Sequence, residues 1–150
     1  MKIQTLVASL LLFVSSCITV EGFEEPTEPI ESVAIINGYR ASFGASVNPY
    51  GISRFFKIIL MSVDGEPTKR SSWSGHPDDV RVLPGIHKIG VFATAPAVGK
   101  HMSGESELSY IFEAGKTYWL TATFRHGELR KVGVVQGDEE PDMLSRFGFM

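Results

Sequence analysis

One segment of this chain, residues 117–124, alternates strictly between two kinds of side chain, and this period of two constrains the fold more than any other feature. One face of the segment is largely polar, and the apolar face carries Tyr118, Leu120, Ala122 and Phe124. Alternation in β-branched and aromatic residues is typical of a strand with one face buried. No segment combines a helical apolar period with capping residues, so the pattern favours an all-β fold.

Further apolar or alternating runs, separated by turn residues, predict more strands. The expected strands cover residues 33–39, 55–63, 80–83, 86–93, 108–112, 117–124 and 129–135. Asp64-Gly65 and Pro84-Gly85 are turn signals, because glycine accepts the positive φ that these turns require. About seven strands in residues 33–137, with enough apolar residues to fill a core, predict a single antiparallel β-sandwich, Ig-like or transthyretin-like.

The first residues of the chain have the pattern of a secretory signal peptide. Lys2 is the only charged residue before Glu21, and residues 6–14 are nearly all apolar. A short positive end, a brief apolar run and then small residues form that pattern. The run is shorter than the ~20 residues that a transmembrane helix needs. The chain is therefore predicted to be exported.

The residues 14–17 (VSSC), which contain the only cysteine of the chain, resemble the lipobox of bacterial lipoproteins. The resemblance implies that residues 1–16 are a lipoprotein signal peptide and that Cys17 carries diacylglyceryl and fatty-acyl groups such as palmitate. Two or three acyl chains anchor a protein stably to a bilayer. The expected location is thus the cell envelope, with Cys17 as the membrane attachment.

The lipobox resemblance also bears on sorting and leaves two alternatives open. Ile18 stands where Asp would favour inner-membrane retention, so in a cell with two membranes the outer membrane, facing the periplasm, is expected. Cleavage near Gly22 would instead release a soluble secreted or periplasmic protein. An uncut membrane anchor is the third alternative.

Composition predicts two poorly structured ends around the domain of residues 33–137. Residues 17–32 contain five glutamates, two prolines and no lysine or arginine, which predicts a flexible acidic tether after the lipidated cysteine. Residues 138–150 begin acidic and end in aromatic residues. They are expected to form a poorly ordered tail, with an aromatic side chain able to pack back onto the domain.

Three turn motifs occur in order along the domain, at residues 63–67 (VDGEP), 82–87 (VLPGIH) and 112–118 (FEAGKTY). Together they resemble the small β-sandwich modules of bacterial envelope lipoproteins, the PEGA-like and transthyretin-like groups. The resemblance extends over about residues 33–135 and implies a fold and an envelope setting. It carries over no catalytic residue.

Few residues have the spacing of a catalytic or metal-binding site, so the protein is expected to be non-enzymatic. The four histidines, His76, His87, His101 and His126, have no metal-ligand spacing, and neither a metal site nor a cofactor is predicted. A formal net charge of −3, without a basic stripe, argues against nucleic-acid binding. The residues 73–79 (WSGHPDD) hold Ser, His and Asp close together, so a small hydrolase using His76 with Asp78 or Asp79 is the alternative.

Three polar stretches rich in small residues, 40–54, 69–79 and 94–106, are expected to be loops. The side chains expected to form a partner-binding loop surface are Trp73, His76, Tyr50 and Met102. Loops of a sandwich commonly carry recognition, and Trp is favoured at binding hot spots. The alternative is a structural role, in which Trp73 covers an open end of the core. The sequence therefore predicts a lipid-anchored binding or accessory module for an envelope protein or glycan, or else a structural subunit of an envelope complex.

Overall fold

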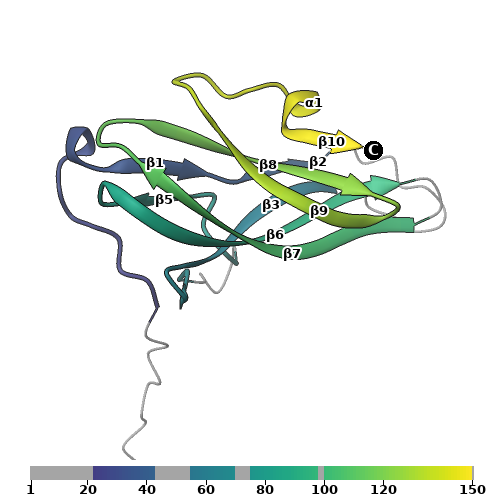
Figure 1. Cartoon of the computed structure of the whole chain (residues 1–150), viewed down its shortest axis with the longest axis horizontal. Coiled ribbons are helices and arrows are strands. Elements are labelled where there is room, and N and C mark those ends of the chain that lie inside the picture. The colour runs from purple at the N-terminus through teal and green to yellow at the C-terminus, as the bar shows by residue number, and fades with distance from the viewer. Residues whose placement is uncertain (1–21, 43–54, 70–74, 98–99, 150) are drawn as a thin grey trace, which may run out of the picture.

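The computed structural model describes residues 22–42, 55–69, 75–97 and 100–149. In these residues the chain is almost entirely strand (Figure 1). The strands are β1 (Ala34–Asn37), β2 (Tyr39–Ser42), β3 (Phe55–Val63), β4 (Glu66–Pro67), β5 (Asp79–Val82), β6 (Gly85–Ala97), β7 (Lys100–Phe112), β8 (Thr117–Arg125), β9 (Glu128–Gln136) and β10 (Phe147–Phe149). The short helices are η1 (Ile30–Ser32) and α1 (Met143–Arg146). The predicted all-β class is confirmed.

All the described strands belong to one sheet, ordered β2-β3-β6-β7-β9-β8-β1-β5, with β10 beside β8 and β4 beside β3. Most neighbours are antiparallel, but β1 and β10 each run parallel to β8, and β7 meets β9 in parallel. The sheet is therefore mixed, and it curls around its core (Figure 1). The predicted sandwich of about seven antiparallel strands is not confirmed.

The first predicted strand, residues 33–39, is divided at Gly38. Before this glycine, β1 lies between β5 and β8, whereas after it β2 pairs with β3 at the other end of the strand order. The division occurs where the backbone is crowded: a Cβ at Gly38 would overlap the carbonyl oxygen of Ile58. The amide of Gly38 donates to the carbonyl of Asp78, 2.8 Å away. One stretch of chain thus joins both ends of the sheet and forces it to curl.

The strand β8 has the predicted alternation, with its apolar side chains fully buried. The main core residues are Ala34, Ile36, Ile58, Leu60, Val63, Val80, Val82, Ile89, Val91, Phe112, Tyr118, Leu120, Phe124 and Phe147. The hydroxyl of Tyr118 accepts the amide of Glu113 at 2.9 Å, so burial of this polar group costs little. At the end of β8, His126 and Gly127 both have positive φ, as a tight hairpin to β9 requires.

The loop predicted for residues 94–106 is wrong, because β6 continues to Ala97 and β7 begins at Lys100. The two strands pair without a break from Gly85 and Phe112 to Ala97 and Lys100. Within residues 94–106, outward positions such as Thr94, Ser103 and Glu105 are polar, and they give this segment the composition of a loop.

The C-terminal segment also differs from the predicted tail. Asp142 caps α1 by accepting the amide of Ser145 at 3.0 Å, and β10 pairs with residues 122–124 of β8. Phe147 packs edge-on against Tyr39 and Phe56. The expected aromatic contact is confirmed, but it belongs to an ordered element that is bonded to the sheet (Figure 1).

The N-terminal segment lies against the sheet rather than apart from it, so the tether predicted for residues 17–32 is not found from residue 22 onward. Residues 22–29, the N-terminal strap, lead into η1 and β1. The amide of Phe23 donates to the carbonyl of Pro67 at 2.8 Å, and the Phe23 ring packs against the core. The carboxylate of Glu25 pairs with Arg81 at 3.1 Å. Cys17 lies outside the described residues.

Within the described part of the chain, no helix has the length and apolar character that crossing a membrane would require.

Candidate functional site

The four side chains predicted to form a partner-binding loop surface do not gather there. Tyr50 and Trp73 lie outside the described residues. Met102 is wrong as a surface residue: it lies on the inner face of β7, opposite Ala95, and is 8% exposed. His76 remains, half-buried, just before β5. Met102 was misplaced because its segment is strand rather than loop.

His76 is held by a buried hydroxyl. The Thr68 Oγ1 lies 2.8 Å from Nδ1 of His76 and 2.7 Å from the carbonyl oxygen of Leu60. A hydroxyl has one proton, and the carbonyl can only accept, so Thr68 donates to Leu60. Nδ1 of His76 therefore donates to Thr68, which fixes the ring orientation. This pair ties the segment before β5 to the end of β3.

Two residues of the hydrolase alternative, His76 and Asp78, have other partners in the described part of the chain. The carboxylate of Asp78 pairs with Nε of Arg40 at 2.6 Å, and Arg40 also donates to the carbonyl of His76. A histidine base would need a carboxylate on its ring nitrogen, but Nδ1 faces Thr68 instead. Among the described residues there is also no group of three or more His, Cys, Asp or Glu that could hold a metal ion.

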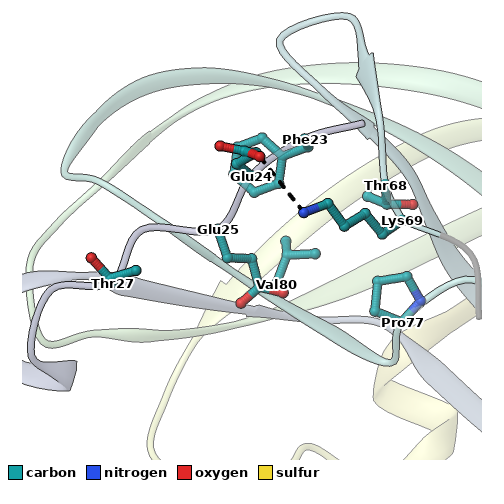
Figure 2. Close-up of a pocket in the computed structure, with 8 residues that line it drawn as sticks. All are labelled: Phe23, Glu24, Glu25, Thr27, Thr68, Lys69, Pro77 and Val80. Atoms are coloured by element: carbon teal, nitrogen blue, oxygen red, sulfur yellow. Dashed lines mark ion pairs between the residues drawn. The ribbon is translucent and has the colours of Figure 1, made fainter. Parts of the chain in front are cut away.

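A pocket of about 410 Å³ lies beside the bonded pair of Thr68 and His76, between the N-terminal strap and β5. Its lining residues are Phe23, Glu24, Glu25, Thr27, Thr68, Lys69, Pro77 and Val80. Figure 2 shows Glu24 and Lys69 pointing toward each other; their charged atoms are 4.0 Å apart. The walls are partly apolar, and both acids come from the strap. The strap therefore forms one side of this pocket.

No family model, curated protein or solved structure matches this chain. What the site binds must therefore follow from its own chemistry.

A second polar cluster, which the sequence did not reveal, joins the β3–β4 turn to β6. Nδ1 of His87 lies 2.7 Å from the carboxylate of Asp64, and its Nε2 lies 2.8 Å from the carbonyl of Leu83. The other carboxylate oxygen of Asp64 accepts the amide of Lys88 at 2.8 Å. Burial raises the pKa of Asp64, but the bonds from Lys88 and His87 outweigh burial and hold that pKa below its ordinary value.

We expect Asp64→Asn to remove part of the acid sensitivity of the fold. A carboxyl group whose pKa is lowered by folding stabilises the protein above its unfolded pKa, and this stabilisation is lost as the pH falls through the folded value. Because the side chain of Asp64 is half exposed, the contribution is below about 1 kcal/mol. Urea unfolding at neutral pH and at acidic pH should therefore show a smaller acid loss for Asp64→Asn than for the wild type.

The matched control for this measurement is Asp138→Asn, which changes an exposed carboxylate that has no such contact in the described residues. This variant should keep the acid loss of the wild type. An unchanged acid loss in Asp64→Asn would contradict the role of the Asp64–His87 pair.

Proposed function

We propose that this chain is a lipid-anchored, non-enzymatic binding or accessory module of a bacterial cell envelope, attached through Cys17. The proposal is supported by the short apolar run and by residues 14–17 (VSSC), the pattern of a lipoprotein signal. In a cell with two membranes, the outer membrane facing the periplasm is the proposed location. Kinship with the PEGA-like and transthyretin-like sandwich modules is part of the same proposal.

The lipobox-like residues 14–17 carry the proposal, and the contact of the N-terminal strap with the sheet indicates how close to the membrane the domain would lie. The strap is bonded to Pro67 and Arg81 from residue 23 onward, so only residues 18–22 separate Cys17 from the first bonded residue, Phe23. The six residue steps from Cys17 to Phe23 span at most about 20 Å. The domain would thus be held directly at the bilayer surface, with the Pro67 side nearest, rather than lifted away on a long spacer.

A module held this way would face the bilayer with one side and offer the rest of its surface to other envelope components. We propose that its partner is a protein or glycan of the envelope.

We expect Cys17→Ser to abolish membrane attachment, because the serine hydroxyl is not a substrate for thioether formation. The wild-type protein should sediment with membranes and partition into detergent, with a mature mass that includes acyl groups on residue 17. Cys17→Ser should lack those groups. Ser16→Ala, which keeps a small residue before the cysteine, is the matched control and should behave as the wild type.

Globomycin, which blocks lipoprotein signal cleavage, should cause the wild-type precursor to accumulate. A mature protein that begins at Phe23 and carries no lipid would contradict the proposal and favour the soluble secreted alternative.

A further inference from the structure

Among the described strands, β5 is the last in the sheet order, and one of its edges has no strand partner there. On one side it pairs with β1, through Ala34 with Val82 and Ile36 with Val80. On the other side the amide of Arg81 points away from β1 and donates to the carboxylate of Glu25 at 3.3 Å. Successive residues of an antiparallel strand direct their backbone groups to alternate sides. The backbone N–H and C=O groups of Asp79 therefore also face outward, beside those of Arg81.

The charged side chains on this edge complement those of the same edge in a second copy of the chain. If two copies of β5 pair in antiparallel orientation about Val80, Asp79 of one copy stands opposite Arg81 of the other. The outward backbone groups belong to the same two residues, so each such pair exchanges both of its N–H···O bonds. Opposite charges directly across two strands stabilise pairing, and like charges oppose it. This one register therefore pairs the outward backbone groups and also places opposite charges across from each other.

The carboxylate of Asp79 is exposed and makes no ion pair or hydrogen bond with any other described residue. Arg81, in contrast, is occupied by the strap. Glu25 accepts from its guanidinium at 3.1 Å as well as from its amide. Edge strands in soluble proteins are commonly covered by charged side chains or by a passing segment. Glu25 covers half of the pairing surface of β5 in this way.

The strap that carries Glu25 is bonded to the domain at few points. Residues of the strap and of β5 line the same pocket of about 410 Å³, and Figure 2 shows Glu25 and Val80 among them. The contact of Glu24 with Lys69 joins two largely exposed side chains at 4.0 Å, a geometry that contributes little. Phe23 is held by its bond to Pro67 and by its ring, which packs against the core. The part of the strap around Glu25 can therefore move away from β5 while Phe23 and the sheet stay in place.

The geometry points to a second copy of this chain as the occupant of the β5 edge, paired in antiparallel orientation about Val80, with Glu25 competing for Arg81. Four residues from each copy bury far less than the about 800 Å² per partner of a standard interface. The dimer is therefore weak and depends on concentration. Copies held on one membrane would meet at a high effective concentration, but the edge pairing itself does not require the lipid on Cys17.

The test is sedimentation velocity of the purified full chain in detergent over a dilution series. Glu25→Ala removes the competing carboxylate and should raise the dimer association constant about tenfold, which corresponds to about 1.4 kcal/mol. Adding Arg81→Asp places Asp opposite Asp in the dimer and should return the protein to monomer. Adding Asp79→Arg to both changes restores opposite charges in the same register, and the dimer should return.

The rescue by the triple variant separates edge pairing from a folding defect, because a misfolded protein would not regain a dimer through a second charge reversal. The control exchanges Glu128 and Arg130, which have the same spacing on β9 and form an exposed ion pair at 2.9 Å. In the Glu25→Ala background this exchange should leave the dimer unchanged.

Two results would overturn the inference. A Glu25→Ala protein that stays monomeric at every concentration shows that the edge does not pair with a second copy. A dimer whose association constant does not change on charge reversal at Asp79 and Arg81 is formed by another surface.

Discussion

Replacing Arg146 by alanine should lower the free energy of unfolding by about 3–5 kcal/mol, the range found when one partner of a buried charged network is removed. The side chain of Arg146 is fully buried. Its guanidinium donates to the carbonyls of Leu120 at 3.0 Å and of Gly38 at 2.7 Å. The Arg146→Ala variant would leave these carbonyls buried without a partner, and each unpaired group costs about 1–3 kcal/mol.

The position of Arg146 follows from a gap in the strand pairing of β8. On one side of β8, β1 pairs with residues 117–119 and β10 with residues 122–124, so none of the described strands reaches the carbonyl of Leu120 on that side; β9 pairs with the other side. The guanidinium fills this gap and also bonds to the chain where β1 becomes β2. It lies over the rings of Tyr39 and Trp119, 4.8 and 5.3 Å from their centroids. The guanidinium of Arg146 thus provides the hydrogen bond that a neighbouring strand would otherwise give to the carbonyl of Leu120.

Burial lowers the pKa of Arg146, while the carboxylate of Glu140, 2.9 Å away, acts in the opposite direction. The charge is kept, because the pKa of an arginine lies far above neutral pH. Arg146→Lys should therefore restore only part of the stability: an ammonium group keeps the charge but cannot direct donors to Leu120, Gly38 and Glu140 at once.

Urea unfolding monitored by tryptophan fluorescence and circular dichroism measures this effect. The matched control is Arg130→Ala, which removes an exposed arginine with a single ion pair to Glu128 and should cost below about 1 kcal/mol. If Arg146→Ala were no more destabilising than Arg130→Ala, the bonds to the β-strand carbonyls would not stabilise the fold.

The sequence was sufficient to predict the elements whose period and turns are local. The strand of residues 117–124 and the run of residues 55–63 appear as β8 and β3, and Asp64-Gly65 forms the expected turn. Residues 117–124 alternate completely, residues 55–63 form a mostly apolar run, and Asp64 and Gly65 both take the positive φ of the turn. Local pattern and tertiary burial agree, so no knowledge of the partner strands was needed.

The elements that sequence reasoning missed depend on residues far apart in the chain. The tail of residues 138–150 has the composition of a disordered segment, yet Arg146 bonds to the carbonyl of Gly38, 108 positions away. Burial of a charged residue is rare unless every donor is paired, and its partners here are backbone carbonyls, which any sequence provides. The gap in β8 exists only after β1 and β10 have paired.

The candidate site was predicted poorly for the same reason. Met102 begins an alternation whose outward positions carry Glu105 and Glu107, and the inward positions after it are the small residues Gly104 and Ser106, which mask the period. Glu25 belongs to an acidic segment that suggested a solvated tether. Its partner, the outward amide of Arg81, exists only because β5 is an edge strand. Sequence composition cannot indicate which strand will be at the edge.

Replacing Gly38 by alanine should lower the free energy of unfolding by about 1–3 kcal/mol, the usual cost of extra volume at a tightly packed position. A Cβ there would overlap the carbonyl oxygen of Ile58 and lie 3.3 Å from that of Asp78. Both obstacles are backbone atoms, of Ile58 in β3 and of Asp78 just before β5, so neither can turn aside as a side chain would. The chain must shift where it crosses from β1 to β2.

The control is Gly137→Ala, whose Cβ would meet only the carbonyl of Glu139 at 3.7 Å and should leave stability nearly unchanged. A Gly38→Ala protein as stable as Gly137→Ala would show that the crossing has room for a side chain. The double variant gives a sharper test. Because Arg146 bonds to the carbonyl of Gly38, a shift there already weakens the arginine contacts. The double variant should therefore lose less free energy of unfolding than the sum of the losses in Gly38→Ala and Arg146→Ala, since contacting residues couple energetically.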